Sequence, residues 1–247
     1  MVWLPRWGCD GMIFGSNQKL LMAQAQVLLW SDLAYVGSQS LTWNSIPAGT
    51  RSYSISESVS ASNTYIILTA NSSSTSDYNS ITGCSVNGTT ASPSLIYGTA
   101  SSYSSFEDRS SVAIFTVSGI SGSSLEIDIS ASGSDTYRSV AAVYKVVGPI
   151  TVRSTQTDVA TPGDATVSAS ISIPSDGFCI AALVAVQNGT TVSFDTGVSS
   201  ETAVTAGGYL ALLPASTENT GSSYVISGDW LDNDANGSAR LLLAAFN

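Results

Sequence analysis

The sequence predicts an all-β protein: two tandem antiparallel β-sandwich modules, jelly-roll-like in form, behind a short N-terminal segment with a helix. Hydrophobic residues make up 43% of the 247-residue chain and charged residues only 11%, a balance typical of short strands joined by polar turns. Apolar runs alternate with turns rich in Ser, Gly and Asn from about residue 41 onward. One pattern of strands and turns also occurs twice, which predicts two modules.

The first 40 residues differ in composition from the rest of the chain. Residues 18–30 are mostly strong helix formers with apolar side chains at helical spacing, so we expect a helix, with a strand as the alternative. This segment either covers an end of the β domain or anchors the chain to a partner, as aromatic side chains often do. The candidate partner-binding residues are Trp3, Trp7, Leu21, Leu28 and Trp30.

Strand signals fill the remainder of the chain. Residues 125–129 alternate strictly between apolar and acidic side chains, as expected of a strand with one buried face. Continuous apolar runs such as residues 140–144 fit central strands that are covered on both faces. The candidate strands are residues 65–70, 112–117, 125–130, 140–147, 165–173, 178–186, 209–213, 224–227 and 240–246.

The repeated pattern is most evident when residues 112–148 are aligned with residues 209–247. Both segments read as an apolar strand, a turn, an alternating strand, a polar turn, and an Arg before a long apolar strand. Upstream, residues 65–70 correspond to residues 178–183. In this alignment Arg138 matches Arg240 and Tyr144 matches Phe246. The predicted units are residues 1–40 as the N-terminal segment, 41–148 as the first module and 149–247 as the second, joined near Gly148 and Pro149.

The first module carries a longer polar stretch, within residues 71–108. This stretch is either a plain connection or a binding loop, since Tyr and Ser suit adaptable contact surfaces. The candidate ligand-contacting residues are Tyr78, Tyr97, Tyr103 and Phe106.

The charge and residue composition of the chain disfavour several partners and chemistries. The net charge is -10 with only eight Lys and Arg, which disfavours nucleic acid and anionic membrane surfaces. No apolar run is long enough to cross a bilayer, so we expect no membrane insertion. The absence of His removes the Ser-His-Asp triad and the His-ligated zinc sites. The three cysteines are far apart in the sequence, and we expect Cys179 to be a small buried apolar residue.

Paired carboxylates are the remaining catalytic signal, because a glycosidase needs two acids across the scissile bond. Glu126 and Asp128 share one face of a predicted strand, and Glu107 and Asp108 are adjacent in a loop. We interpret the first pair as a solvated sheet face and the second as a turn. We therefore expect no enzymatic activity.

The stretch DNDANG begins like a calcium-binding loop of the form D-x-D-x-N-G. The acidic twelfth ligand of such a loop is missing, because that position is Leu243. We expect a hairpin turn equivalent to residues 131–137 of the first module and no cofactor, with a weak calcium site as the alternative. The candidate metal ligands are Asp232, Asp234 and Asn236.

The second module has a recognisable order of strands and prolines. Its parts are the turn Pro174 to Gly177, the apolar run 178–186, the proline-ended run 209–214, the alternating run 224–227 and the closing run 240–246. This order resembles β-sandwich modules of bacteriophage virion structural proteins of the tail-fibre, head-fibre or spike type. The first module lacks the proline after residues 112–117 and matches less well, and the N-terminal segment lies outside the resemblance.

The resemblance implies a non-enzymatic structural protein, assembled in the host cytoplasm and displayed on the virion exterior as a fibre, spike or decoration component. Its partners would be other virion proteins of the capsid, portal or tail, with a host-surface glycan as a further ligand in host attachment. The resemblance also favours a homotrimer. The alternatives are a carbohydrate-binding module, which would present aromatic side chains to sugars, and a surface glycosidase or depolymerase that uses a carboxylate pair.

Overall fold

The computed structural model describes residues 33–73, 80–98, 109–160, 166–186, 191–195, 198–218, 223–231 and 238–247. The described residues form antiparallel strands throughout, and no helix occurs among them. The predicted all-β fold made of antiparallel sandwiches is therefore confirmed. The helix expected in residues 18–30 lies outside the described residues, and β1 begins at Ala34, inside the segment that the sequence sets apart.

Among the described residues, the strands before Gly148 form one seven-stranded sheet, in which β4, β3, β7, β2, β6 and β5 follow one another and β1 pairs with β7. β1 and β7 are much longer than the others, at 22 and 23 residues. The strands are β1 (Ala34–Ile55), β2 (Asn63–Ser73), β3 (Ser80–Val86), β4 (Thr89–Thr90), β5 (Ser92–Gly98), β6 (Arg109–Ser118) and β7 (Leu125–Val147).

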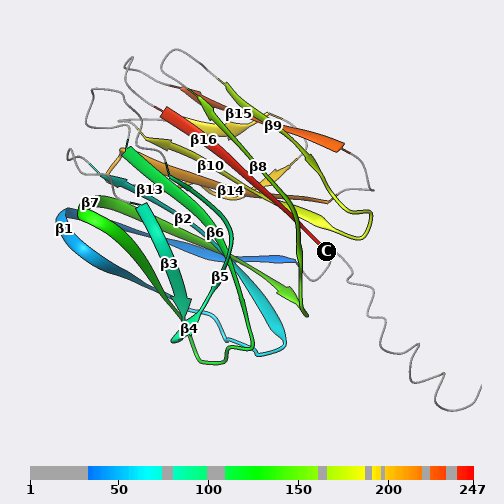
Figure 1. Cartoon of the computed structure of the whole chain (residues 1–247), viewed down its shortest axis with the longest axis horizontal. Helices are drawn as coiled ribbons and strands as arrows, with labels where there is room; N and C mark the ends of the chain where they lie inside the picture. Colours follow the sequence, from blue (N-terminus) through cyan, green and yellow to red (C-terminus); the bar gives the residue numbers. More distant parts are fainter. Residues whose placement is uncertain are drawn as a thin grey trace, which may run out of the picture.

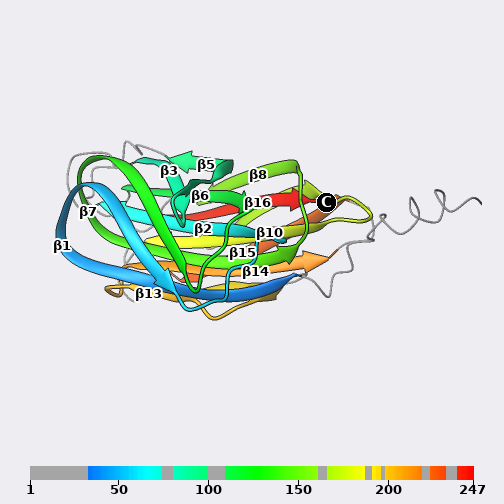
Figure 2. The ribbon, with the colours of Figure 1, turned by 90° about the horizontal axis from the view of Figure 1, so that it is seen from below.

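β1 and β7 bend together, and this bend turns the one sheet into two layers (Figures 1 and 2). Residues 138–147 of β7 pair with β2, whereas residues 127–132 pair with β3. The register between β1 and β7 shifts between Thr42 and Ile46 and again between Pro47 and Gly49, as in the bulges that bend paired strands. The turn predicted at residues 131–137 is therefore wrong: β7 continues through these residues because β1 pairs with it on both sides of the bend.

The strands described after Pro149 form two sheets. One has the order β12, β14, β10, β16, β8, with β13 also paired to β14, and the other has the order β11, β15, β9. The strands are β8 (Val152–Ala160), β9 (Thr166–Ser172), β10 (Phe178–Val186), β11 (Thr191–Phe194), β12 (Ser199–Ser200), β13 (Val204–Ala206), β14 (Leu210–Glu218), β15 (Ser223–Leu231) and β16 (Ser238–Phe246).

Both sandwiches are double-sheet folds of jelly-roll-like form. In the second sandwich β8, β16, β10 and β14 form the inner sheet, and β9, β15 and β11 face them. In the first sandwich residues 34–42 of β1, residues 138–147 of β7, β2 and β6 form the equivalent inner sheet. The domain boundaries at residues 40 and 148 stay predictions.

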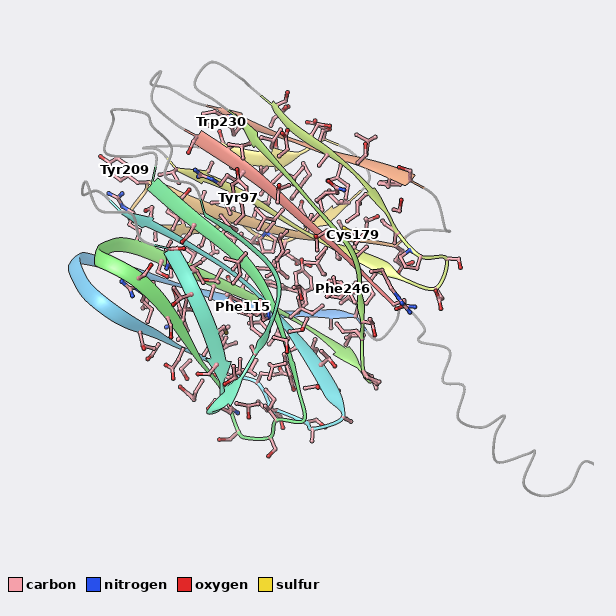
Figure 3. The ribbon with its side chains drawn as sticks, in the orientation of Figure 1. Tyr97, Phe115, Cys179, Tyr209, Trp230 and Phe246 are labelled. Carbon is pink, nitrogen blue, oxygen red and sulfur yellow. The ribbon has the colours of Figure 1, made fainter. Side chains whose placement is uncertain are left out.

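Three apolar cores separate four layers of strands, which Figure 1 shows from β3 at the bottom to β9 at the top. Phe115 lies in the core of the first sandwich and Trp230 in that of the second, while Phe246 lies in a central core between them (Figure 3). The two inner sheets thus have apolar side chains on both faces. This burial explains the continuous apolar runs of β10 and β16, in which every residue is buried.

The strand registers of the two sandwiches match around the repeated residues. Ile66 pairs with Tyr144 and Thr116, and the corresponding residue Phe178 pairs with Phe246 and Glu218. These registers support the alignment of Tyr144 with Phe246. They also align Phe178 with Ile66, whereas the sequence comparison aligns it with Tyr65.

A shared bulge also supports the duplication. The register of β1 slips by one residue at Val36, opposite the step from Tyr144 to Val143. The register of β8 slips by one residue at Arg153, opposite the step from Phe246 to Ala245. Because bulges are designed features of related folds, their occurrence at matching positions indicates that one strand arrangement has been used twice.

Candidate functional sites

The inner sheets pack against each other with approximate two-fold symmetry. β1 of the first sandwich contacts β13 of the second, and its counterpart β8 in the second sandwich contacts β5 of the first. In the same way, β7 contacts β14, and its counterpart β16 contacts β6. β2 and β10, which also correspond to each other, meet at the centre of this interface. Such a reciprocal arrangement is the geometry of a two-fold dimer interface, here formed within one chain.

The repeated arginines each reach across the interface to the other sandwich. The Arg138 guanidinium carbon lies 4.0 Å from the centre of the ring of Tyr209, the residue just before β14 in the sequence (labelled in Figure 3). Arg240 is 1% exposed, and its Nη1 donates a hydrogen bond to the Ser110 hydroxyl on β6. Sequence comparison aligns the two arginines, but it does not show that they join the halves, because their partners differ in chemistry.

The carboxylates of Glu126 and Asp128 lie on the outer face of the first sandwich. The Ser54 hydroxyl donates to Glu126 Oε1 at 2.7 Å, and the Ser52 hydroxyl donates to Asp128 Oδ1 at 2.6 Å. Hydrogen bonds from Ser54 and then Ser124 lower the pKa of Glu126. These cross-strand contacts match the predicted solvated sheet face and hold both side chains on the surface of the sheet.

A second acidic pair lies on the outer face of the second sandwich. Asp195 follows β11 and Asp229 lies on β15, and the Ser227 hydroxyl donates to Asp195 Oδ2 at 2.7 Å. A hydrogen bond with Asp195 raises the pKa of Asp229, because the bond requires a proton on one of the two carboxyl groups. Sequence reasoning missed this pair, since the two residues are far apart along the chain.

The described cysteines are buried thiols. Burial raises the pKa of Cys84 and of Cys179 to about 12, so neither is a reactive thiolate at neutral pH. Cys179 lies among the apolar side chains of the second core, in agreement with the expected small buried residue (Figure 3).

A groove of about 420 Å³ opens at the end of the molecule where the first sandwich passes into the second. One wall is the face of the first inner sheet beyond its apolar centre, with Thr64, Thr116 and Ser118. The opposite wall is the connection from Pro149 to Val152. Sequence reasoning did not find this site, because isolated Thr and Ser residues are too common in the chain to carry a signal.

Most of the candidate site residues from the sequence lie outside the described part of the chain. Tyr97 is described: it lies on β5, half buried, and packs against the central core (Figure 3). Its contact with a ligand stays a prediction. The candidates outside the described residues are Trp3, Trp7, Leu21, Leu28, Trp30, Tyr78, Tyr103, Phe106, Asp232, Asp234 and Asn236, together with the acids Glu107 and Asp108.

Within the described ranges, no three His, Cys, Asp or Glu side chains are grouped so that they could hold a metal ion. The same part of the chain contains no helix with the length and apolar character needed to cross a membrane. Comparisons with models of protein families, with curated proteins and with solved structures give no match to this chain.

Proposed function

We propose that the protein is a non-enzymatic structural protein of a bacteriophage virion, displayed on the particle exterior as a fibre, spike or decoration component. The observation that carries this proposal is the central core shared by the two jelly rolls. Two inner sheets that are apolar on both faces make one rigid block, whereas a hinge between separate domains would need a smaller and more polar interface.

The fold and the charge agree with such a role. Jelly rolls form viral capsid proteins as well as lectins, so the fold suits both display and adhesion. The net charge of -10 favours solubility of a protein assembled in the host cytoplasm. On this proposal the capsid, portal or tail supplies the binding partner, and the chain assembles as a homotrimer.

Attachment is assigned to the residues before β1, with Trp3 and Trp7 as aromatic anchors. The test uses particles from a phage whose copy of the gene has been deleted. Purified full-length protein is added, and the particles are sedimented. We expect the full chain to sediment with the particles and a chain of residues 33–247, which keeps β1 intact, to stay in solution.

The controls separate the two parts of the proposal. Trp3→Ala with Trp7→Ala should weaken sedimentation, while Ser54→Ala on the outer sheet face should leave it unchanged. If the truncated chain sediments as well as the full chain, the attachment assignment is wrong. If the full chain does not sediment with particles at all, the virion role is wrong.

A further inference from the structure

We propose that the groove beside the connection between the sandwiches binds a neutral saccharide. The groove lies on the face of the first inner sheet that packs against the second sandwich. This face is apolar at Ile66 and Ile114 and becomes hydroxylated toward the strand ends, at Thr64, Thr116 and Ser118. The second sandwich does not cover these hydroxyls, which instead face the connecting residues.

The hydroxyls form a regular array. Thr64 pairs with Ser118 on the neighbouring strand, and Ser92 of β5 pairs with Thr116. Opposite residues on paired strands lie roughly 4.5–5.5 Å apart, and residues two apart along a strand lie about 7 Å apart. A ligand on this face therefore meets several hydroxyls at spacings comparable to the width of a sugar ring.

These side chains have unused hydrogen-bonding capacity. Among the described residues, the hydroxyls of Ser92, Thr116 and Ser118 have no hydrogen-bond partner in the protein. A hydroxyl both donates and accepts, which matches the hydroxyls of a saccharide. None of the described residues that line the groove has a charged side chain, so nothing in this part of its walls favours a phosphate or a carboxylate as the ligand.

The apolar part of the groove suits the carbon face of a sugar. Ile150 and Val152 are half buried against the central core, and Pro93 lies at the start of β5. Ligand sites commonly combine such apolar contact area with a few polar groups, and a volume of about 420 Å³ lies within their range.

Hydrogen bonds hold the connection that forms one wall of the groove. The Thr64 hydroxyl donates to the Gly148 carbonyl at 2.7 Å, and the Gly148 N–H donates to the Ser62 carbonyl at 2.8 Å. The Thr151 N–H donates to the Asn247 carbonyl at 2.9 Å. Both ends of the connection are fixed in this way, so a ligand would not need to order it on binding.

The repeat shows that this site is specific to the first sandwich. Thr116 pairs with Ile66, and in the matching register Glu218 pairs with Phe178. The second sandwich therefore has a carboxylate where the groove has Thr116, and its β12 and β13 are only two and three residues long where β5 has seven. Duplication alone does not explain the hydroxyl array.

The test is an NMR titration of the full-length, ¹⁵N-labelled chain with lactose, cellobiose and chitobiose, with sialyllactose as a negatively charged comparison. We expect at least one neutral sugar to give saturable shifts at the amides of Thr116, Ser118 and Thr151. The double variant Thr116→Val with Ser118→Ala should bind that sugar at least about tenfold more weakly, through the loss of two hydrogen bonds. Thr166→Val, on the exposed face of β9, is the matched control and should bind as the wild type does.

A second variant keeps the test independent of folding effects in the sheet. Ser92 is exposed, so Ser92→Trp fills the groove without entering the core, and we expect it to abolish the shifts. The proposal is overturned if no neutral sugar gives saturable shifts up to its solubility limit, if the shifts lie away from the groove, or if sialyllactose binds more tightly than lactose. The saccharide site does not depend on the virion role, because the purified chain alone is titrated.

Discussion

The guanidinium of Arg138 in the first sandwich lies 4.0 Å above the ring of Tyr209 in the second, and the sequence counterpart of Arg138, Arg240, crosses the interface in the opposite direction to Ser110. The two contacts mark the same end of the central core. They give the paired jelly rolls polar contacts in addition to their apolar packing. We expect both contacts to contribute measurably to stability.

For the first contact, Tyr209→Leu should lower the free energy of unfolding by about 0.5–2 kcal/mol, because a leucine has no aromatic face for the Arg138 cation. Tyr209→Phe retains the ring and should stay close to the wild type. Chemical denaturation followed by circular dichroism measures both variants. Equal losses for the two variants would show that the hydroxyl of Tyr209, and not its ring, is the stabilising group.

For the second contact, Ser110→Ala removes the nearer acceptor of Arg240 Nη1 and leaves this buried donor with the longer hydrogen bond to the Ser238 hydroxyl, at 3.4 Å. We expect a loss of about 1–3 kcal/mol in the free energy of unfolding. Ser92→Ala, at an exposed position, is the control and should change stability by less than about 0.5 kcal/mol. A Ser110→Ala variant as stable as this control would contradict the assigned role of the hydroxyl.

The shared core predicts that the two sandwiches unfold together. Ile180 is fully buried in the central core, so Ile180→Ala should cost about 2–5 kcal/mol. Native-state hydrogen exchange should then accelerate by the same factor at the amides of Ile67 in the first sandwich and Leu183 in the second. Faster exchange confined to Leu183 would mean that the halves unfold independently.

The acidic pair predicts a pH-dependent stability. The pKa of Asp229 is raised in the folded protein, so its contribution to stability is present at acidic pH and is lost as the pH rises through the raised value. Asp229→Asn should therefore raise the melting temperature at pH 7, where the wild-type carboxylates repel each other. This gain should shrink as the pH falls below about 4, the ordinary range of an Asp.

The control for this prediction is Glu218→Gln, which removes one negative charge at the exposed end of β14. It should leave the pH profile of the melting temperature nearly unchanged. A gain for Asp229→Asn that persists undiminished at acidic pH would show that removal of the charge is not its cause.

The sequence predicts the fold class well because burial leaves a direct trace in it. The strand expected at residues 178–186 is β10 residue for residue, since every position there is buried and apolar. β1 and β8 escape prediction, because Ser, Thr and Gln occur along both strands and neither contains a long apolar run. Their identity as strands depends on pairing with β7 and β16, which sequence patterns do not record.

The same limit applies to the candidate sites. Arg138 and Arg240 can be aligned from the sequence. The sequence alignment of residues 112–117 with the start of β14, however, differs from the equivalence that the strand pairing shows. In the structure Val112 and Pro214 hold equivalent positions, because they pair with Ala70 and Ala182 respectively. Turns of different length between the strands cause this difference. The groove could not be predicted at all, since the described residues of its walls come from four separate stretches of the chain.

The virion role is the central claim, and mass spectrometry of purified particles tests it most directly. On the proposed virion role, particles of a phage that carries the gene are purified by density gradient and digested with protease before and after disruption. We expect peptides of this chain in a constant ratio to the major capsid protein, and their release from intact particles by protease, as for an exterior protein. The absence of the chain from the particles, with all of it free in the lysate, would contradict the claim.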